Sequence, residues 1–261
     1  MVHFSKVYDE FVKELIPNYA ELSDVHSSLQ NHGFCILDAA KVRQWVGCST
    51  DELNDLSSDW ADMPHDKYLK DGGRYRRRRH SSFIFEDNTL TQVPHRAHWQ
   101  SLDYNALHGG MERWFEPVLN TTIAKSAWSK ILYKLAQTAT QLSEPIQKLW
   151  CIEAHQFRID TTDGIGRPTP EGAHRDGVNF VAVFMVDRHD IKGGETRVFD
   201  ANGPHGERFT LTEPWSLLLL DDTRMIHEST PIQPFLKPGY RDTLVVTLSE
   251  NYFQNAVAQI P

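Results

Sequence analysis

The sequence predicts a mainly β fold with flanking helices, because the spacing of its apolar residues changes at Pro145. Over about residues 1–145, apolar residues mostly recur at helical spacing. After Pro145, short β-rich runs alternate with turns that contain Gly or Pro. Several short strands separated by such turns are typical of a sandwich or a barrel. The chain length suits a single domain, which we expect to span residues 1–261.

The helix-rich first part contains recognisable start and stop signals. Proline interrupts a helix, so Pro17 should divide the periodic segment 6–31 into two helices. Ser49 or Thr50 is a suitable N-cap for a helix over 50–60. The other elements expected in this part are a strand at 33–37, a turn at 71–73 that leads into a strand ending at 85, and a helical region over 110–145.

The second part is predicted to consist of strands joined by turns. The segment 161–172 is a long, proline-containing loop, and long loops in compact domains are often functional. The strands are expected over 150–159, 178–186, 195–199, 207–211, 215–220 and 241–248.

Composition and charge exclude several classes of protein. The net charge of −8 disfavours general binding to nucleic acids or to anionic membranes. No run approaches the roughly 20 apolar residues that a membrane span needs, and the first residues lack the apolar stretch of a signal peptide. The three cysteines form no CxxC pair, so we expect a reduced, cytoplasmic protein. The oligomeric state has no signature in the sequence.

Two histidines and an aspartate form a candidate metal site. His174 and Asp176 are two residues apart, so an extended segment places both side chains on one face. His227 follows an apolar strand and a polar bend, several strands further along the chain. A double-sheet jelly roll brings such distant strands together, and we expect this core over about residues 146–250. Two imidazoles and one carboxylate leave other metal positions open, which suits non-haem Fe(II) used for O₂ chemistry.

Arg241 is the candidate for binding a keto-acid co-substrate. It opens the apolar, β-branched run that we expect to form the last buried strand, and a buried charge needs a partner. A guanidinium can bind a carboxylate with two parallel hydrogen bonds. Thr243 is two residues further on, so its hydroxyl shares the same face and can donate to the same carboxylate.

Simpler interpretations exist for each of these residues. The His174–Asp176 segment alone is compatible with a polar loop, and His227 with a hydrogen-bonded core histidine. Arg241 alone is compatible with a structural ion pair. A structural zinc site usually has four closed ligands and uses cysteine, which disfavours it here. A cupin-like metal-binding module would not need Arg241. It is the order of all four residues that favours the iron site over these alternatives.

At this point the sequence resembles a known family, the Fe(II)/2-oxoglutarate dioxygenases. Within it, the similarity is to the bacterial hydroxylases of free L-amino acids, the group that includes L-isoleucine 4-hydroxylase. The resemblance spans roughly residues 30–250, and Tyr75-Arg76-Arg77 also fits it. The motifs that carry it are the segments 174–181, 193–196, 221–227 and 239–245.

The resemblance implies a double-stranded β-helix, with iron bound by His174, Asp176 and His227. It further implies that 2-oxoglutarate chelates the iron and is anchored by Arg241. In the implied reaction, O₂ is consumed, 2-oxoglutarate is decarboxylated to succinate and CO₂, and an unactivated C–H bond is hydroxylated. Related halogenases have a small residue at the position of Asp176, so its presence favours hydroxylation.

The arginine-rich run before residue 80 is a candidate for substrate binding. A solvated basic face is the simpler interpretation, but in a strand alternate arginines point to opposite sides. One of them is therefore expected to face the site and bind a substrate carboxylate. The candidates are Arg76, Arg77, Arg78 and Arg79.

The strand over 150–159 offers two further pairs, one on each of its faces. Gln156 and Arg158 share one face, and we expect this pair to border the substrate. His155 and Phe157 share the other face, and the alternation of side chains allows this pair to border it equally well. No acid at a suitable spacing supports His155 as a metal ligand. His95 and His98 can share a helical turn, but without the Glu of an HExxH motif they are expected to be surface histidines.

The sequence therefore predicts an Fe(II)/2-oxoglutarate-dependent hydroxylase that acts on an aliphatic L-amino acid or a close derivative. Sulfoxidation of methionine by the same site is one alternative. A metal-dependent sensor or stress protein that kept the fold without the activity is another. The complete ligand set and Arg241 disfavour the sensor, because a decayed enzyme should lose some of these residues.

Overall fold

The computed structural model describes residues 15–146 and 149–255, and it shows a mainly β protein with a jelly-roll core. All strand pairs are antiparallel. One large sheet has the order β1-β9-β5-β12-β4-β2-β3, and two small sheets have the orders β10-β7-β8 and β11-β6. The strands are β1 (Phe34–Leu37), β2 (Arg76–Glu86), β3 (Thr89–Gln92), β4 (Leu149–Asp160), β5 (Phe180–His189), β6 (Ile191–Gly193), β7 (Thr196–Asp200), β8 (Gly206–Phe209), β9 (Ser216–Asp221), β10 (Met225–Ser229), β11 (Ile232–Pro234) and β12 (Tyr240–Glu250).

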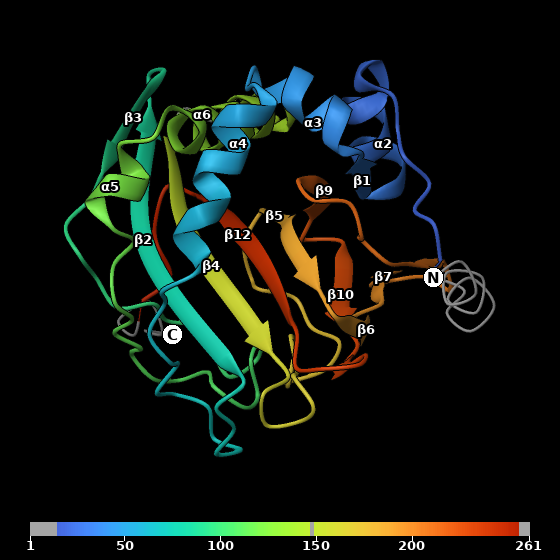
Figure 1. Ribbon diagram of the computed structural model, residues 1–261. Coiled ribbons are helices and arrows are strands. Elements are labelled where there is room, and N and C mark those ends of the chain that lie inside the picture. Colours follow the sequence, from blue (N-terminus) through green and yellow to red (C-terminus); the bar gives the residue numbers. More distant parts are fainter. Residues whose placement is uncertain (1–14, 147–148, 256–261) are drawn as a thin grey trace.

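Helices lie together on one face of the large sheet (Figure 1). Their starts follow from local sequence: Ser49 and Glu52 form a capping box, and the Asp38 carboxylate accepts the backbone N–H of Lys41. The helical elements are η1 (Leu22–Asp24), α2 (Val25–His32), α3 (Ala39–Val46), α4 (Thr50–Ser57), η2 (Ser58–Trp60), α5 (Asn120–Ile123) and α6 (Ser126–Leu142).

The alternation of side chains along the strands separates a core from a cavity. On β12, Leu244 and Val246 point to the helices and pack in the main core, whereas Thr243 and Val245 line a cavity on the other face. This inner face of the large sheet looks toward the small sheets, and a second apolar cluster fills the space between them. Its buried members include Val181, Met185, Val198, Phe209, Leu218 and Leu220. The cavity therefore lies inside the jelly roll, beside its apolar filling.

Most predicted elements are present, but some boundaries were wrong. Residues 15–21 are not helical, and most of the first helix predicted before Pro17 lies outside the described residues. The helical region predicted from residue 110 begins only at Asn120. Sequence patterns missed α3 and the short strands β3, β6, β10 and β11. These strands have three to five residues, which is too short for a periodic signal.

The helix-rich first part does not form a separate layer of its own. Its strands β1, β2 and β3 occupy both edges of the large sheet, and β2 pairs along its whole length with β4 from the second part. This pairing carries the arginine-rich run into the wall of the cavity. Within the described ranges, no helix combines the length and apolarity needed to cross a membrane.

Candidate active site

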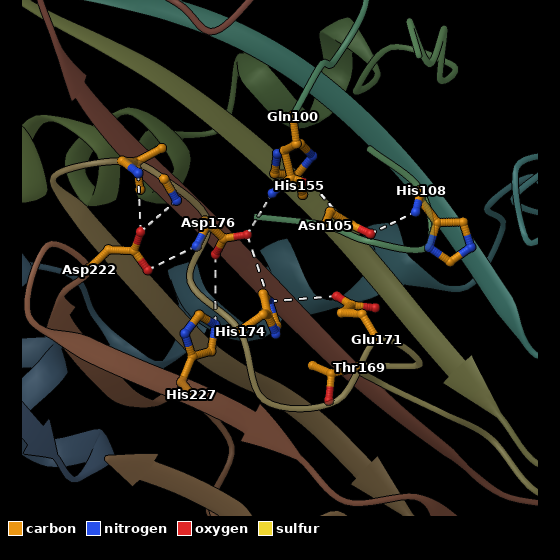
Figure 2. A network of polar contacts seen from close by, with 12 residues as sticks. Gln100, Asn105, His108, His155, Thr169, Glu171, His174, Asp176, Asp222 and His227 are labelled. Atoms are coloured by element: carbon orange, nitrogen blue, oxygen red, sulfur yellow. Dashed lines mark hydrogen bonds and ion pairs between the residues drawn. The ribbon is translucent and has the colours of Figure 1, made fainter. Parts of the chain in front are cut away.

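His174, Asp176 and His227 come together at the cavity, with their potential ligand atoms all within 4.8 Å of one another (Figure 2). His174 lies in the loop before β5 and His227 on β10, and each backbone N–H donates to the other's carbonyl at 3.0 and 2.9 Å. The Asp176 carboxylate lies between the two imidazoles, 3.8 Å from His174 Nε2 and 3.7 Å from His227 Nε2. These distances are too long for hydrogen bonds, so both nitrogens remain available.

The two imidazoles fit a metal at this position. His174 Nδ1 donates to the Gly172 carbonyl at 2.9 Å, which places the ring proton on Nδ1 and leaves the Nε2 lone pair free. His227 is buried, and its Nδ1 has no hydrogen-bond partner among the described residues. Its other nitrogen, Nε2, lies 3.7 Å from the Asp176 carboxylate without a hydrogen bond and is the one that can bind a metal. The donor set of two imidazoles and one carboxylate suits Fe(II) with open positions.

Electrostatics favour the metal-binding protonation states of Asp176 and His227 but not that of His174. Burial alone would raise the pKa of Asp176, but the nearby imidazoles lower it below its usual range. Burial lowers the pKa of His227 to about 4, helped by His174. Burial also acts to lower the pKa of His174, but Asp176 and Glu171 beside it raise it overall. A metal cation at the centre would replace this proton on His174.

Asp222 holds the loop that carries Asp176. Its carboxylate accepts the backbone N–H groups of Asp176, Gly177 and Val178 at 3.0, 2.7 and 3.1 Å. Burial and the neighbouring Asp176 carboxylate raise the pKa of Asp222 to about 7. The turn also requires a glycine, because Gly177 has φ +75° and a Cβ there would lie 2.4 Å from the Tyr104 ring.

Gln100 is a residue of the candidate site that the sequence patterns missed. Its Nε2 donates to Asp176 Oδ1 at 2.8 Å (Figure 2). Its Oε1 accepts from Arg113 at 2.8 Å and from Asn105 at 3.1 Å. These bonds orient the aspartate toward the histidines. Gln100 lies between β3 and α5 in a segment without regular periodicity, so no spacing rule marks it.

Arg241 lies in the same cavity and has a free guanidinium edge. It is 4% exposed, its side chain donates only to Ser229 Oγ at 3.4 Å, and its Nε has no partner. In the described part of the chain, no carboxylate lies within ion-pair distance of it. Burial, with Arg188 nearby, lowers its pKa to about 10, so it stays charged. Thr243 lines the cavity on the same face of β12, as the alternation predicted.

The arginine-rich run alternates across β2, so that Arg76 and Arg78 line the cavity. Arg77 and Arg79 do not line it: Arg77 lies 3.6 Å from the Asp160 carboxylate, and Arg79 donates to the Pro117 carbonyl. The sequence led us to expect one arginine of this run in the site, and the structure places two there, Arg76 and Arg78. Arg77 and Arg79 lie away from the site.

The substrate role expected for Gln156 and Arg158 is not supported by their position. Both lie on the helix-facing side of β4, and it is His155 and Phe157 that line the cavity. Arg158 makes a two-pronged ion pair with Asp242, at 2.8 and 2.6 Å. Gln156 is fully buried there and its side-chain amide has no hydrogen-bond partner. Which face of β4 lines the cavity depends on how β4 pairs with β2 and β12. The alternation of residues within β4 alone does not reveal this pairing.

A second group of potential ligands borders the cavity: His80, His98, Glu153 and His155, all buried. Glu153 Oε1 accepts from His80 Nε2 at 3.1 Å and from Arg96 at 3.2 Å, and Oε2 accepts from His98 Nδ1 at 3.2 Å. The expectation of a surface position is wrong for His98. The expectation that His155 has no nearby acid was also wrong, because Glu153 lies on the same face of β4.

In this second group, the carboxylate and two of the imidazoles that face it are joined by hydrogen bonds, which disfavours a metal between them. Both carboxylate oxygens of Glu153 are already occupied, and Arg78 donates to His155 Nδ1 at 2.9 Å. Burial lowers the pKa of His98 to about 3, which keeps this ring neutral. Burial would raise the pKa of Glu153, but His98 and His80 hold it well below its usual range. The cations Arg78 and Arg96 next to these rings oppose a further metal cation.

Comparisons with known proteins agree with this fold. The solved structure of a BsmA homologue from Methylobium petroleophilum is 48% identical, covers 93% of this chain and 98% of its own, and superimposes with a TM-score of 0.87. IDO from Bacillus thuringiensis shares the fold at 18% identity, with 89% and 100% of the two chains covered and a TM-score of 0.73. The Fe(II)/α-ketoglutarate-dependent dioxygenase TqaL does so at 17% identity, with 87% and 86% covered and a TM-score of 0.68. No curated protein matches the sequence.

The family model described as 2OG-Fe dioxygenase matches residues 57–247, a range that includes the three candidate metal ligands and Arg241. The family implies Fe(II), 2-oxoglutarate and O₂ as cofactor and co-substrates, and the triad is a candidate group of iron ligands. The chain belongs to the 2OG-Fe dioxygenase family.

Proposed function

We propose that this dioxygenase hydroxylates an aliphatic L-amino acid or a close derivative. The observation that carries the proposal is the composition of one cavity. It contains the His–Asp–His triad, the unpaired Arg241, and an apolar wall formed by Val183, Leu218 and Val245. The triad and Arg241 account for iron and 2-oxoglutarate, and the apolar wall suits an aliphatic side chain.

The residues of the cavity have separate tasks in this reaction. His174, Asp176 and His227 would hold Fe(II), and Gln100 keeps the Asp176 carboxylate oriented. Arg241 binds the far carboxylate of 2-oxoglutarate through charge-assisted hydrogen bonds. When bound, the iron supplies the redox chemistry with O₂ that oxidises the substrate C–H bond.

The overall reaction balances in atoms and electrons. Decarboxylation of 2-oxoglutarate to succinate and CO₂ provides two electrons, and oxidation of the C–H bond to an alcohol provides the other two. One oxygen atom of O₂ enters succinate and the other enters the new hydroxyl group. The apolar residues Val183, Leu218 and Val245 in the cavity wall limit the access of water to this step.

The test is formation of succinate with Fe(II), ascorbate and 2-oxoglutarate across the twenty amino acids, followed by mass analysis of the product. We expect turnover stimulated by Leu, Ile or Met and a product heavier by one oxygen atom. His174→Ala serves as the inactive control. Metal and 2-oxoglutarate binding without stimulation by any amino acid or N-acyl amino acid would contradict the proposal.

We also propose a cytoplasmic location. Cys35, Cys48 and Cys151 are all buried free thiols, and burial raises the pKa of Cys35 to about 12 and that of Cys151 to about 11. Free thiols are typical of reducing compartments. Fractionation of the native host cells tests this.

A further inference from the structure

Arg78 is a buried cation without an anionic partner. It is 5% exposed and lies between the rings of Phe115 and Phe157, 3.8 and 4.5 Å from their centres. It donates to the neutral His155, and its Nε has no partner. Through the described ranges, no carboxylate comes within ion-pair distance of it. The aromatic faces stabilise the charge only in part, and Asp66 and Glu153 act on it from beyond ion-pair distance. An anion in direct contact with Arg78 is therefore missing.

Arg113 is a second buried cation of this cavity that has no carboxylate in contact with it. It is 2% exposed, donates to Gln100 Oε1 at 2.8 Å, and has no partner at Nε and no carboxylate within ion-pair distance in the described part of the chain. Arg76 provides the contrast, because it also lines the cavity but is neutralised by Asp66 at 2.7 Å. Burying a charge without a counter-ion is costly, and two such charges at one cavity wall indicate a binding site for an anion.

This anion is distinct from the far carboxylate of 2-oxoglutarate. Arg241 lies on β12 and Arg78 on β2, and β4 lies between these strands. Strands are spaced roughly 4.8 Å apart, so the two guanidinium-bearing strands are roughly 10 Å apart. The cavity therefore offers two separate cationic ends, of which the co-substrate uses the one at Arg241.

Glu171 offers the opposite charge in the same cavity. Its Oε1 lies 3.6 Å from His174 Nε2, and its Oε2 is buried without any hydrogen-bond partner. Glu171 is close enough to Arg113 to stabilise its charge, yet the two are not in ion-pair contact. The Glu171 carboxylate and the guanidinium groups of Arg78 and Arg113 therefore line one cavity without forming ion pairs. This leaves room for a ligand that carries both a negative and a positive charge.

We propose that Arg78 and Arg113 bind the α-carboxylate of the amino-acid substrate and that Glu171 binds its α-ammonium group. This assignment rests on the proposed function and makes it more specific. It requires a free α-amino acid, because an N-acyl derivative lacks the ammonium group. The apolar wall of Val183, Leu218 and Val245 then receives the side chain.

The test measures binding by calorimetry under nitrogen, so that the Fe(II)- and 2-oxoglutarate-loaded protein does not turn over. The probes are L-leucine, L-isoleucine and L-methionine, together with leucinamide, which lacks the carboxylate, and 4-methylpentanoate, which lacks the ammonium group. The variants are Arg78→Met, Arg113→Met and Glu171→Gln. Arg79→Met is the matched control, because Arg79 lies on the same strand but away from the cavity.

We expect Arg78→Met and Arg113→Met to weaken binding of the best amino acid by about tenfold or more, the usual effect of losing a hydrogen bond to a charged group. These variants should also lose the preference for the amino acid over leucinamide. Glu171→Gln should lose the preference over 4-methylpentanoate. Arg79→Met should behave as wild type, and 2-oxoglutarate affinity should stay within about twofold in all four variants.

Three outcomes would overturn the assignment. In the first, unchanged amino-acid affinity in Arg78→Met and Arg113→Met removes the carboxylate site. In the second, weakened Fe(II) binding in Glu171→Gln makes Glu171 a metal ligand instead. In the third, the wild-type protein binds Fe(II) and 2-oxoglutarate but none of the amino acids. A wild-type protein that binds no 2-oxoglutarate would instead contradict the proposed function itself.

Discussion

Two groups of histidine and carboxylate side chains border the same cavity, and they differ in how their polar atoms are used. In His174, Asp176 and His227, the facing atoms are 3.7 to 3.8 Å apart and form no hydrogen bonds with one another. In the group around Glu153, the imidazoles donate to the carboxylate at 3.1 to 3.2 Å. The facing atoms of the first group therefore remain available for a metal, whereas those of the second group are already joined to one another by hydrogen bonds.

The comparison teaches that proximity of ligand-type residues does not by itself define a metal site. Both groups satisfy the same distance limit of 4.8 Å. What separates them is the surroundings: Gly172 and Gln100 orient the triad from outside, while Arg78 and Arg96 place positive charge next to the second group. Supporting contacts that leave the metal-facing atoms free are the distinguishing feature.

The largest effect is expected for Asp176→Ala. Removing the only carboxylate of the triad should weaken Fe(II) binding and lower turnover by more than about a hundredfold, which exceeds the usual cost of losing a supporting residue. Iron affinity and succinate formation measure this. An Asp176→Ala protein with wild-type iron affinity and wild-type turnover would show that the comparison assigns the metal to the wrong group.

Glu153→Gln tests the other group. Since Glu153 accepts from three donors in a buried position, its loss should destabilise the fold by about 3 kcal/mol, while the protein still binds one iron. The pKa of Glu153 is held below its ordinary value of 4.5, so the carboxylate stabilises the fold fully above that pH. The difference from wild type should therefore shrink as the pH falls below 4.5. Urea unfolding at several pH values measures it, and a pH-independent difference would contradict the ionic role.

Arg241→Ala extends the comparison to the cations of the cavity. Arg78 already bonds to the histidine network, whereas Arg241 has only a long contact to Ser229. Its removal should raise the KM for 2-oxoglutarate by roughly thirtyfold, as expected for a lost charge-assisted pair, with a smaller change in kcat. Steady-state kinetics with varied 2-oxoglutarate measure this. A wild-type KM would remove Arg241 from the co-substrate site.

The smallest effect is expected for Gln100→Leu, which removes a supporting contact of the triad but no ligand. The lost bond to Asp176 should lower Fe(II) affinity by about tenfold. Competition with a metal chelator measures the affinity. Thermal unfolding provides the control, because a general loss of stability of the same size as in Glu153→Gln would mean that Gln100 acts on the fold and not on the metal ligands.

Some of the site could be predicted because its residues follow simple rules along the chain. His174 and Asp176 share a face at a spacing of two, and Arg241 and Thr243 do the same on β12. For the arginine-rich run, spacing along the chain was not sufficient to identify the residues that face the site. Alternation implied that half of the arginines face inward, but only the pairing with β4 decided that Arg76 and Arg78 are the ones that do.

Other residues could not be predicted, because they act through contacts between segments far apart in sequence. Gln100 lies 76 positions before Asp176, to which it donates, and it comes from an irregular segment without periodicity. Glu153 meets His80 and His98 only because β2 pairs with β4 and the loop that carries His98 covers both. Gln156 and Arg158 were assigned to the wrong face for the same reason.

The sequence by itself determined the type of fold and the candidates for metal ligands and for the co-substrate arginine, because these depend on strand periodicity and on the order of a few chemically distinctive residues. The tertiary structure decided which imidazoles face a carboxylate without bonding to it, which arginines lack a counter-ion in contact, and that Glu171 shares their cavity. The physical reason is that hydrogen-bond saturation and charge pairing are properties of neighbours in space. No local pattern encodes them, since the partners come from different strands and from loops without a period.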